Sequence, residues 1–272
     1  MSIKEDIEKT KLVKNGYESD KYGKIYFHSN ERLKDIFSQL DVKDKNVFTV
    51  LASGDQAFYF YDNGAKKVDL FDINKLSIYY YYLRVWIINY LGRFYPRTLC
   101  NEFIKDLLDI VEVKSEEEKE AVLFWKKYIK NFSNGEINEL LYFSENPFLN
   151  KINDVSNLAS KLKEKKFNFY NIDISGKIEV PNKYNIIYTS NAADYLYHDK
   201  KTFESYRDNL DELLDDDGIV VCANVLRGRA SIIEREVFSH KFLLSDLEYI
   251  EDKHFCGSPG YVYKRRWFGV YN

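Results

Sequence analysis

Residues 47–56 have the sequence VFTVLASGDQ, an apolar run that ends in a small polar turn. The run is short and rich in β-branched residues, which is typical of a strand buried on both faces. Residues 57–61 continue as a helix, and Asn63-Gly64 ends it, because glycine readily adopts the left-handed conformation of a helix C-cap. The stretch therefore predicts a strand, a glycine-containing turn and a helix in succession.

A second strand is predicted at residues 68–72, where the sequence VDLFD ends on an acidic residue. Asp72 lies about twenty residues after Gly54, the spacing found in the opening unit of nucleotide-binding parallel sheets. In that unit the turn presents main-chain N–H groups at a helix N-terminus, and the acid accepts hydrogen bonds from the ribose hydroxyls. These two strands and their turn thus predict a nucleotide-binding α/β fold.

The alternation of strands and helices resumes later in the chain. The predicted elements are strands at 167–173, 184–191 and 219–223 and a helix at 200–214. Asp217-Gly218 is predicted as a turn before the last of these strands, and residues 260–271 as a terminal antiparallel strand. We predict a single α/β domain over residues 1–272, with a Rossmann-like, doubly wound, mostly parallel sheet and an antiparallel C-terminal strand.

Residues 92–166 interrupt this alternation. Ser115 and Glu118 form a capping box, in which each side chain satisfies a main-chain N–H group at the start of a helix. Asp154 or Ser156 is a candidate N-cap for a further helix. We predict a mostly helical insertion after the second strand, packed beside the sheet.

Composition argues against several classes of function. The net charge is −3 with both signs interspersed, so no basic stripe is available for phosphates and no nucleic-acid partner is expected. Three distant cysteines provide no metal-ligand spacing, which predicts a reducing compartment and no metal site. The polar N-terminus lacks the apolar stretch of a signal peptide, so we expect a cytoplasmic protein.

Residues 76–91 are apolar almost all round and include four consecutive tyrosines. The segment is shorter than the roughly 20 apolar residues that a membrane span requires, and it contains Arg84 and Asn89. We therefore predict a helix buried in the core and no transmembrane segment.

Four segments together resemble a known family. They are residues 50–56, 68–74, 171–173 and 190–196. Their order is similar to that of the class I S-adenosylmethionine-dependent transferases, most of all to the branch with the diacylglycerol 3-amino-3-carboxypropyltransferases of betaine-lipid synthesis. That branch has a Ser-Gly-Asp-like turn where ordinary methyltransferases have Gly-x-Gly, and a helical insertion after the second strand. The resemblance spans about residues 25–225 and implies S-adenosylmethionine as the cofactor.

The resemblance also implies a set of cofactor-binding residues. They are Ala52, Ser53, Gly54, Asp55, Gln56, Asp72, Ile73, Asn74, Ile172, Asp173, Ser190 and Asn191. By their positions, the turn 52–55 would pack against the methionine moiety, and Asp72 would hold the ribose hydroxyls. Ile73 or Asn74 would flank the adenine.

The remaining positions complete the implied site. Asp173, with Ile172, would meet the adenine amino group, while Ser190 and Asn191 would face the reactive end of the cofactor.

Asp194 and Tyr195 are the candidate catalytic residues, because the resemblance places them in the acceptor pocket. With His198 they form a polar cluster in which a carboxylate or imidazole could accept the proton that an acceptor amine or hydroxyl loses. A structural role is the open alternative to a catalytic one: Asp194 would cap a helix, and Tyr195 would be a packing residue.

Three functions are consistent with these residues. The first is transfer of the 3-amino-3-carboxypropyl group to a small-molecule or lipid acceptor, with release of methylthioadenosine; the Ser-Gly-Asp-Gln turn favours it. The second is methyl transfer to a small molecule, because the fold does not determine which carbon is attacked. The third is a non-catalytic protein that binds the cofactor.

Overall fold

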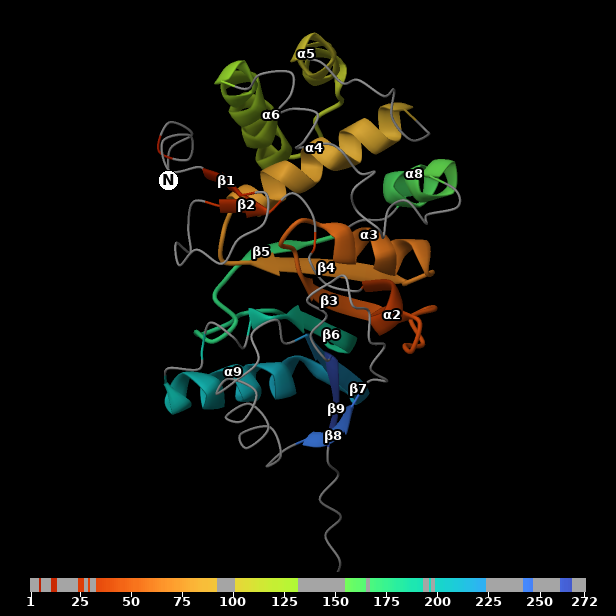
Figure 1. Ribbon diagram of the computed structural model, residues 1–272, viewed down its shortest axis with the longest axis vertical. Helices are drawn as coiled ribbons and strands as arrows, with labels where there is room; N and C mark the ends of the chain where they lie inside the picture. Colours follow the sequence, from red (N-terminus) through yellow and green to blue (C-terminus); the bar gives the residue numbers. More distant parts are fainter. Residues whose placement is uncertain are drawn as a thin grey trace, which may run out of the picture. The chain divides into compact units, whose positions relative to one another are not determined.

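The computed structural model describes residues 5, 11–13, 24–26, 29, 33–91, 101–131, 155–164, 167–192, 196, 199–223, 242–246 and 260–265. In these residues the chain forms both strands and helices (Figure 1). The chain forms two compact units. The first comprises Met1–Asn30, Leu51–Asp62 and Asp72–Asn171, and the second comprises Glu31–Val50, Asn63–Phe71 and Ile172–Asn272.

The main sheet has the strand order β5-β4-β3-β6-β7-β9-β8. The bounds are β3 Asn46–Val50, β4 Lys67–Asp72, β5 Phe169–Asn171, β6 Tyr184–Ser190, β7 Leu214–Ala223, β8 Phe242–Asp246 and β9 Gly260–Arg265. β3 is parallel to β4 and β6, and β6 is parallel to β7, whereas β9 is antiparallel to β7 and β8. The earliest of these strands lies in the middle of the order. This arrangement confirms the predicted Rossmann-like, doubly wound sheet with an antiparallel C-terminal strand.

In the second unit, β3 forms because its residues suit a strand that is buried on both faces. Val47, Phe48 and Thr49 are all buried, as the apolar run predicts. Helix α2 (Leu33–Phe37) precedes this strand. Helix α9 (Lys200–Leu213) begins at Asp199, whose carboxylate accepts hydrogen bonds from two main-chain N–H groups of the first turn. Its buried face consists of Phe203, Tyr206, Leu210 and Leu213.

Strand β7 begins earlier than the sequence predicts. Residues 214–218 already belong to it, so the interpretation of Asp217-Gly218 as a turn is wrong. The pairing with β6 shifts register between Tyr184↔Leu214 and Ile186↔Ile219, which marks a bulge. A Cβ on Gly218 would lie 2.7 Å from the Leu214 side chain and 2.9 Å from the Tyr184 carbonyl oxygen. Glycine is therefore needed here for a close approach inside a strand.

The strand ends also differ from the predictions. β5 covers only Phe169–Asn171 because Asp173 forms a turn: its carboxylate accepts from Ser175 N at 3.0 Å, and its carbonyl accepts from Gly176 N at 2.9 Å. β9 confirms the start of the predicted terminal strand at Gly260, and residues 266–271 lie outside the described part of the chain. β8 was not predicted.

The first unit contains most of the helices. Their bounds are α3 Asp55–Asp62, α4 Leu76–Leu91, α5 Asn101–Ile110, α6 Glu116–Tyr128, the 3-10 helix η1 Ile129–Asn131 and α8 Val155–Glu164. Helix α4 packs against α6 and α8, and α8 packs against α3 (Figure 1). The short strands β1 (Lys11–Val13) and β2 (Lys24–Tyr26) form a separate parallel pair. The described part of residues 92–166 is thus largely helical.

Two caps in the insertion test the sequence predictions. Ser115 is the N-cap of α6, as predicted, and its Oγ accepts from Glu118 N at 3.1 Å. The Glu118 carboxylate accepts from Lys114 N rather than from Ser115 N. Helix α8 begins at Val155, so Ser156 lies inside its first turn and is not the cap, while Asp154 is outside the described residues.

Helix α4 has the predicted bounds, and its tyrosines, Tyr79 to Tyr82, are all buried. Among the described helices, α4 included, none has the length and apolar character that crossing a bilayer would require.

Candidate cofactor site

The turn after β3 has an unusual main chain. Ala52 has a φ of 43° and Gly54 a φ of 87°, both in the left-handed region. That region costs a non-glycine residue about 1–2 kcal/mol, so Ala52 must be held there by its surroundings. Gly54 N donates to Leu51 O at 2.6 Å, which closes the turn tightly.

Asp72, the last residue of β4, holds this turn in the first unit. Its Oδ2 accepts from Ala52 N at 2.9 Å, and its Oδ1 accepts from Asn74 N at 2.8 Å. The side chain is buried, and the residue is 8% exposed. Burial raises the pKa of Asp72 to about 6, although hydrogen bonds from Asn74, Ser77, Ala52 and Ile73 oppose the rise.

The two residues after Asp72 have different environments. Asn74 is buried, and its Oδ1 accepts from Leu76 N at 3.0 Å, so its amide oxygen caps the start of α4. Ile73 is half-buried. Asn171 Nδ2 donates to the carbonyl oxygens of Asp72 at 2.9 Å and Ile73 at 3.0 Å, which fixes the chain just after β4. Of the two residues predicted to flank adenine, Ile73 is the one without a capping role.

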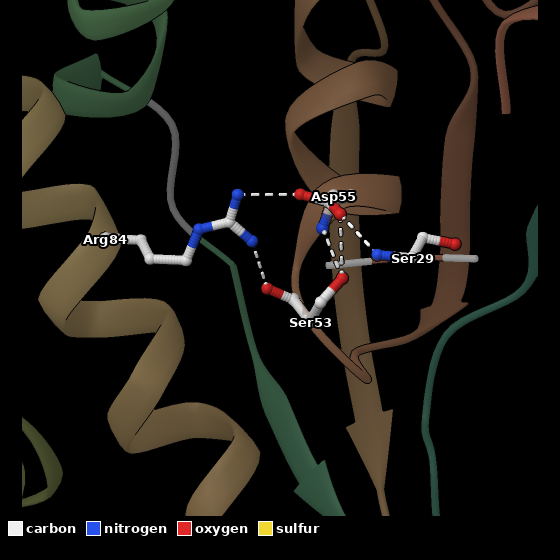
Figure 2. Close-up of polar contacts among 4 residues, drawn as sticks. All are labelled: Ser29, Ser53, Asp55 and Arg84. Carbon is white, nitrogen blue, oxygen red and sulfur yellow. Dashed lines mark hydrogen bonds and ion pairs between the residues drawn. The ribbon is translucent and has the colours of Figure 1, made fainter. Parts of the chain in front are cut away.

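Asp55 lies at the start of α3 and is fully buried. Arg84 of α4 donates to both the turn and this acid: Nη2 to Asp55 Oδ1 at 2.7 Å, and Nη1 to the Ser53 carbonyl oxygen. Figure 2 shows the other Asp55 oxygen accepting from Ser29 N at 2.6 Å and from Ser53 Oγ at 3.0 Å. Both oxygens of the Asp55 carboxylate therefore have hydrogen-bond partners inside the protein.

The first unit thus brings together Ala52, Ser53, Gly54, Asp55, Asp72 and Asn74 from the predicted set. Gln56, the next residue of α3, is also buried.

Four other predicted cofactor residues belong to the second unit. Ser190 ends β6 with a φ of 55° and is buried, and its Oγ donates to Asn191 Oδ1 at 3.3 Å. Ile172 is half-buried, and Asp173 is exposed. The Asp173 carboxylate also accepts from Ser175 Oγ at 2.6 Å, so it stabilises its own turn.

The candidate catalytic residues Asp194 and Tyr195 lie outside the described residues, as does His198. Their roles stay predictions.

Arg84 and Ser29 were not singled out as site residues from the sequence. Arg84 carries a signal in retrospect, because a lone arginine in a helix that is apolar all round needs a buried partner. Ser29 carries none, since it contributes a main-chain N–H group.

The arrangement fits a nucleoside better than it fits a phosphate. A buried carboxylate at the end of β4 suits paired hydroxyl donors, and the Asp72 residue keeps 8% of its area exposed, whereas Asp55 has no exposed area. The cation that contacts the turn, Arg84, is already paired with Asp55.

Fold and site together define a doubly wound α/β protein with a glycine-containing turn after β3 and an acid at the end of β4. No family model and no curated protein matches the sequence. Among solved structures, the glycopeptide N-methyltransferase MtfA in complex with S-adenosyl-L-homocysteine matches with a TM-score of 0.48 at 6% identity, over 89% of this chain and 92% of that one. The N-methyltransferase NodS from Bradyrhizobium japonicum matches with a TM-score of 0.41 at 8% identity, over 86% and 83%.

A TehB-like methyltransferase from Corynebacterium glutamicum is a third match, with a TM-score of 0.40 at 11% identity over 88% of each chain. At these values the similarities identify no reaction and no substrate. The fold class rests on the strand order of this chain.

Proposed function

We propose that the chain binds S-adenosylmethionine at the turn 52–56 and Asp72, and transfers a group from it to a small-molecule acceptor. One observation carries the proposal: the Asp72 carboxylate accepts a hydrogen bond from the main-chain N–H of Ala52. The acid at the end of β4 is therefore joined to the turn after β3. This is the arrangement that a ribose and its attached chain require.

When bound, S-adenosylmethionine supplies a sulfonium centre that makes an adjacent carbon susceptible to attack. The protein's task is then mainly to orient that carbon in line with the acceptor. Asp72 would accept from the ribose hydroxyls and orient the nucleoside. The main chain of Ala52 and Gly54 would approach the methionine moiety, because neither residue places a bulky side chain there.

Methyl transfer is the simplest reaction for this site. Transfer of the 3-amino-3-carboxypropyl group, to a small-molecule or lipid acceptor, is the second candidate. One observation favours it: Ser53-Gly54-Asp55 replaces the more open glycine-rich turn, and its side chains bond to one another. A turn closed by side chains could present a different carbon to the acceptor, because the orientation of the sulfonium decides which bond breaks.

The nucleoside product distinguishes these reactions. Purified protein is incubated with S-adenosylmethionine and a small-metabolite extract, and the nucleosides are identified by mass spectrometry. S-adenosylhomocysteine indicates methyl transfer, and methylthioadenosine indicates aminocarboxypropyl transfer. Asp72→Ala, shown to be folded by circular dichroism, is the control and should abolish either product. Binding of the cofactor without either product would contradict the transferase proposal and leave a non-catalytic binding protein.

A further inference from the structure

We infer that Arg84 is a positioning residue for the cofactor: it holds the main chain of Ser53–Asp55 in the conformation that binds the methionine moiety. The inference rests on the proposed function and deepens it, because it assigns cofactor affinity to a residue on α4, outside the strand-end turns. Three observations carry it.

The first observation is that Arg84 contacts both ends of the turn. Its guanidinium donates through Nη1 to the Ser53 carbonyl oxygen and through Nη2 to the Asp55 carboxylate (Figure 2). The Asp55 carboxylate in turn accepts from Ser29 N and Ser53 Oγ. One planar group therefore fixes a carbonyl, a carboxylate and, through it, a hydroxyl. Rotation of the Ser53 peptide would break the Nη1 bond.

The second observation is the burial of this ion pair. Arg84 is 1% exposed and Asp55 has no exposed area. The guanidinium also lies over the rings of Phe58 at 4.8 Å and Tyr80 at 5.4 Å. Taking both charges out of water is costly, and apolar residues of similar size often serve stability as well or better. The Arg84–Asp55 pair is therefore better explained by the conformation that it imposes on the turn than by a contribution to the stability of the fold.

The third observation is that α4 also touches the centre of the turn. Tyr81, three residues before Arg84, is fully buried. A Cβ on Gly54 would lie 2.7 Å from Tyr81 Cδ2, so the tyrosine ring rests directly against the glycine. One face of α4 therefore contacts all three residues of the turn 53–55, through Arg84 at its two ends and Tyr81 at its centre. Helix α4 therefore restrains residues 53–55 of the turn, in addition to the hydrogen bond that Asp72 accepts from Ala52 N.

Arginine is specifically required by this geometry. A lysine at position 84 would keep the positive charge, but its ammonium group is compact and lacks the planar fork that reaches two acceptors at once. Arg84→Lys therefore separates charge from geometry. We expect it to stay folded and to lose the restraint on the Ser53 carbonyl.

The test measures the dissociation constant of S-adenosylhomocysteine by calorimetry, at a temperature where circular dichroism shows each variant folded. Arg84→Lys should weaken binding by about tenfold or more, equivalent to about 1.4 kcal/mol or more. With S-adenosylmethionine as substrate, KM should rise by more than kcat falls, because the restraint acts on binding. Glu120→Gln is the matched control: it removes the acid of another ion pair, with Lys75 just before α4, and should bind like the wild type.

A second variant keeps the test decisive if Arg84→Lys does not fold. The double variant Asp55→Asn/Arg84→Met removes both buried charges together, and it should fold but bind S-adenosylhomocysteine weakly. Wild-type affinity in either folded variant would overturn the inference and leave the proposed function intact. A wild-type chain that does not bind S-adenosylhomocysteine would overturn both.

Discussion

Helix α4 and the residue just before it make two ion pairs that differ in almost every physical respect. Arg84 pairs with Asp55 at 2.7 Å, and the two side chains are 1% and 0% exposed. Lys75 pairs with Glu120 of α6 at 2.6 Å, and these side chains are 34% and 44% exposed. The distances are alike, but water surrounds one pair and is excluded from the other.

The partners around each pair differ as well. Glu120 also accepts from Tyr79 Oη at 2.8 Å, and its bonds to Lys75 and Tyr79 lower its pKa. Glu117, one turn earlier on α6, accepts from Tyr82 Oη at 2.9 Å. These contacts join side chains on two helices. In contrast, Arg84 donates to the main chain of the turn at Ser53, and Asp55 accepts from the Ser53 hydroxyl and from the main chain of Ser29. The comparison teaches that the contacts on the α6 side of α4 stabilise the packing of the two helices. The contacts of Arg84 restrain the main-chain conformation of the turn after β3.

The largest predicted effect separates these two sides. Arg84→Met leaves Asp55 charged, buried and without its cation, and should lower the free energy of unfolding by about 3–5 kcal/mol. Glu120→Gln should cost less than about 1 kcal/mol, because exposed pairs contribute little. Chemical denaturation of both variants measures the difference. Equal losses would contradict the distinction between the two pairs.

Asp72 provides a second test through pH. Its pKa is about 6 in the folded chain and near the ordinary 3.8 when unfolded, so the folded state holds this proton more tightly. The group therefore favours folding most below pH 3.8, and that contribution is lost as pH rises through about 6. The loss amounts to about 3 kcal/mol.

Asp72→Asn should remove this part of the pH dependence. The free energy of unfolding is measured from pH 4 to pH 8 in the wild type and the variant, and the difference between the two curves isolates Asp72. A difference that does not change with pH would show that Asp72 has an ordinary pKa.

Gly54→Ala tests the other contact that α4 makes with the turn. Alanine disfavours a φ of 87°, and its Cβ would collide with the Tyr81 ring, so a loss of about 2 kcal/mol is expected. Gly64→Ala is a suitable control. Its φ is 82°, but the nearest atom to the added Cβ is 3.6 Å away. The excess loss at Gly54 over Gly64 measures the contact with Tyr81, and equal losses would refute it.

A further small effect is predicted on the α6 side of α4. Tyr82→Phe removes the hydrogen bond to Glu117 and should cost about 1 kcal/mol. Affinity for S-adenosylhomocysteine should not change, because Tyr82 makes no described contact with the turn. A loss of affinity as large as that in Arg84→Lys would show that both sides of α4 control the cofactor site.

The sequence predicted those elements for which the hydrophobic periodicity and the turn residues indicate the same structure. The β3 run, the Ser53-Gly54 turn, the acid at the end of β4 and the bounds of α4 all follow from periodicity and turn chemistry. The bulge in β7 escaped prediction because Asp217-Gly218 has the composition of a turn, and only pairing with β6 shows that the strand continues.

The turn after β3 and the acid that ends β4 could be located from the sequence, but their contacts could not. Asp55 has the right position for a cofactor contact, yet its partner Arg84 lies 29 positions along the chain and Ser29 lies 26 positions before it. No local pattern encodes such pairs. Sequence reasoning could therefore locate the turn, while the means by which the turn is held required the structure.

Calorimetric titration of the wild-type chain with S-adenosylhomocysteine, alongside folded Asp72→Ala, tests the central claim most directly. We predict saturable binding to one site per chain in the wild type, and binding weakened by at least about tenfold in the variant. No heat of binding in the wild type, or equal affinity in the two proteins, would contradict a cofactor site built on Asp72 and the turn after β3.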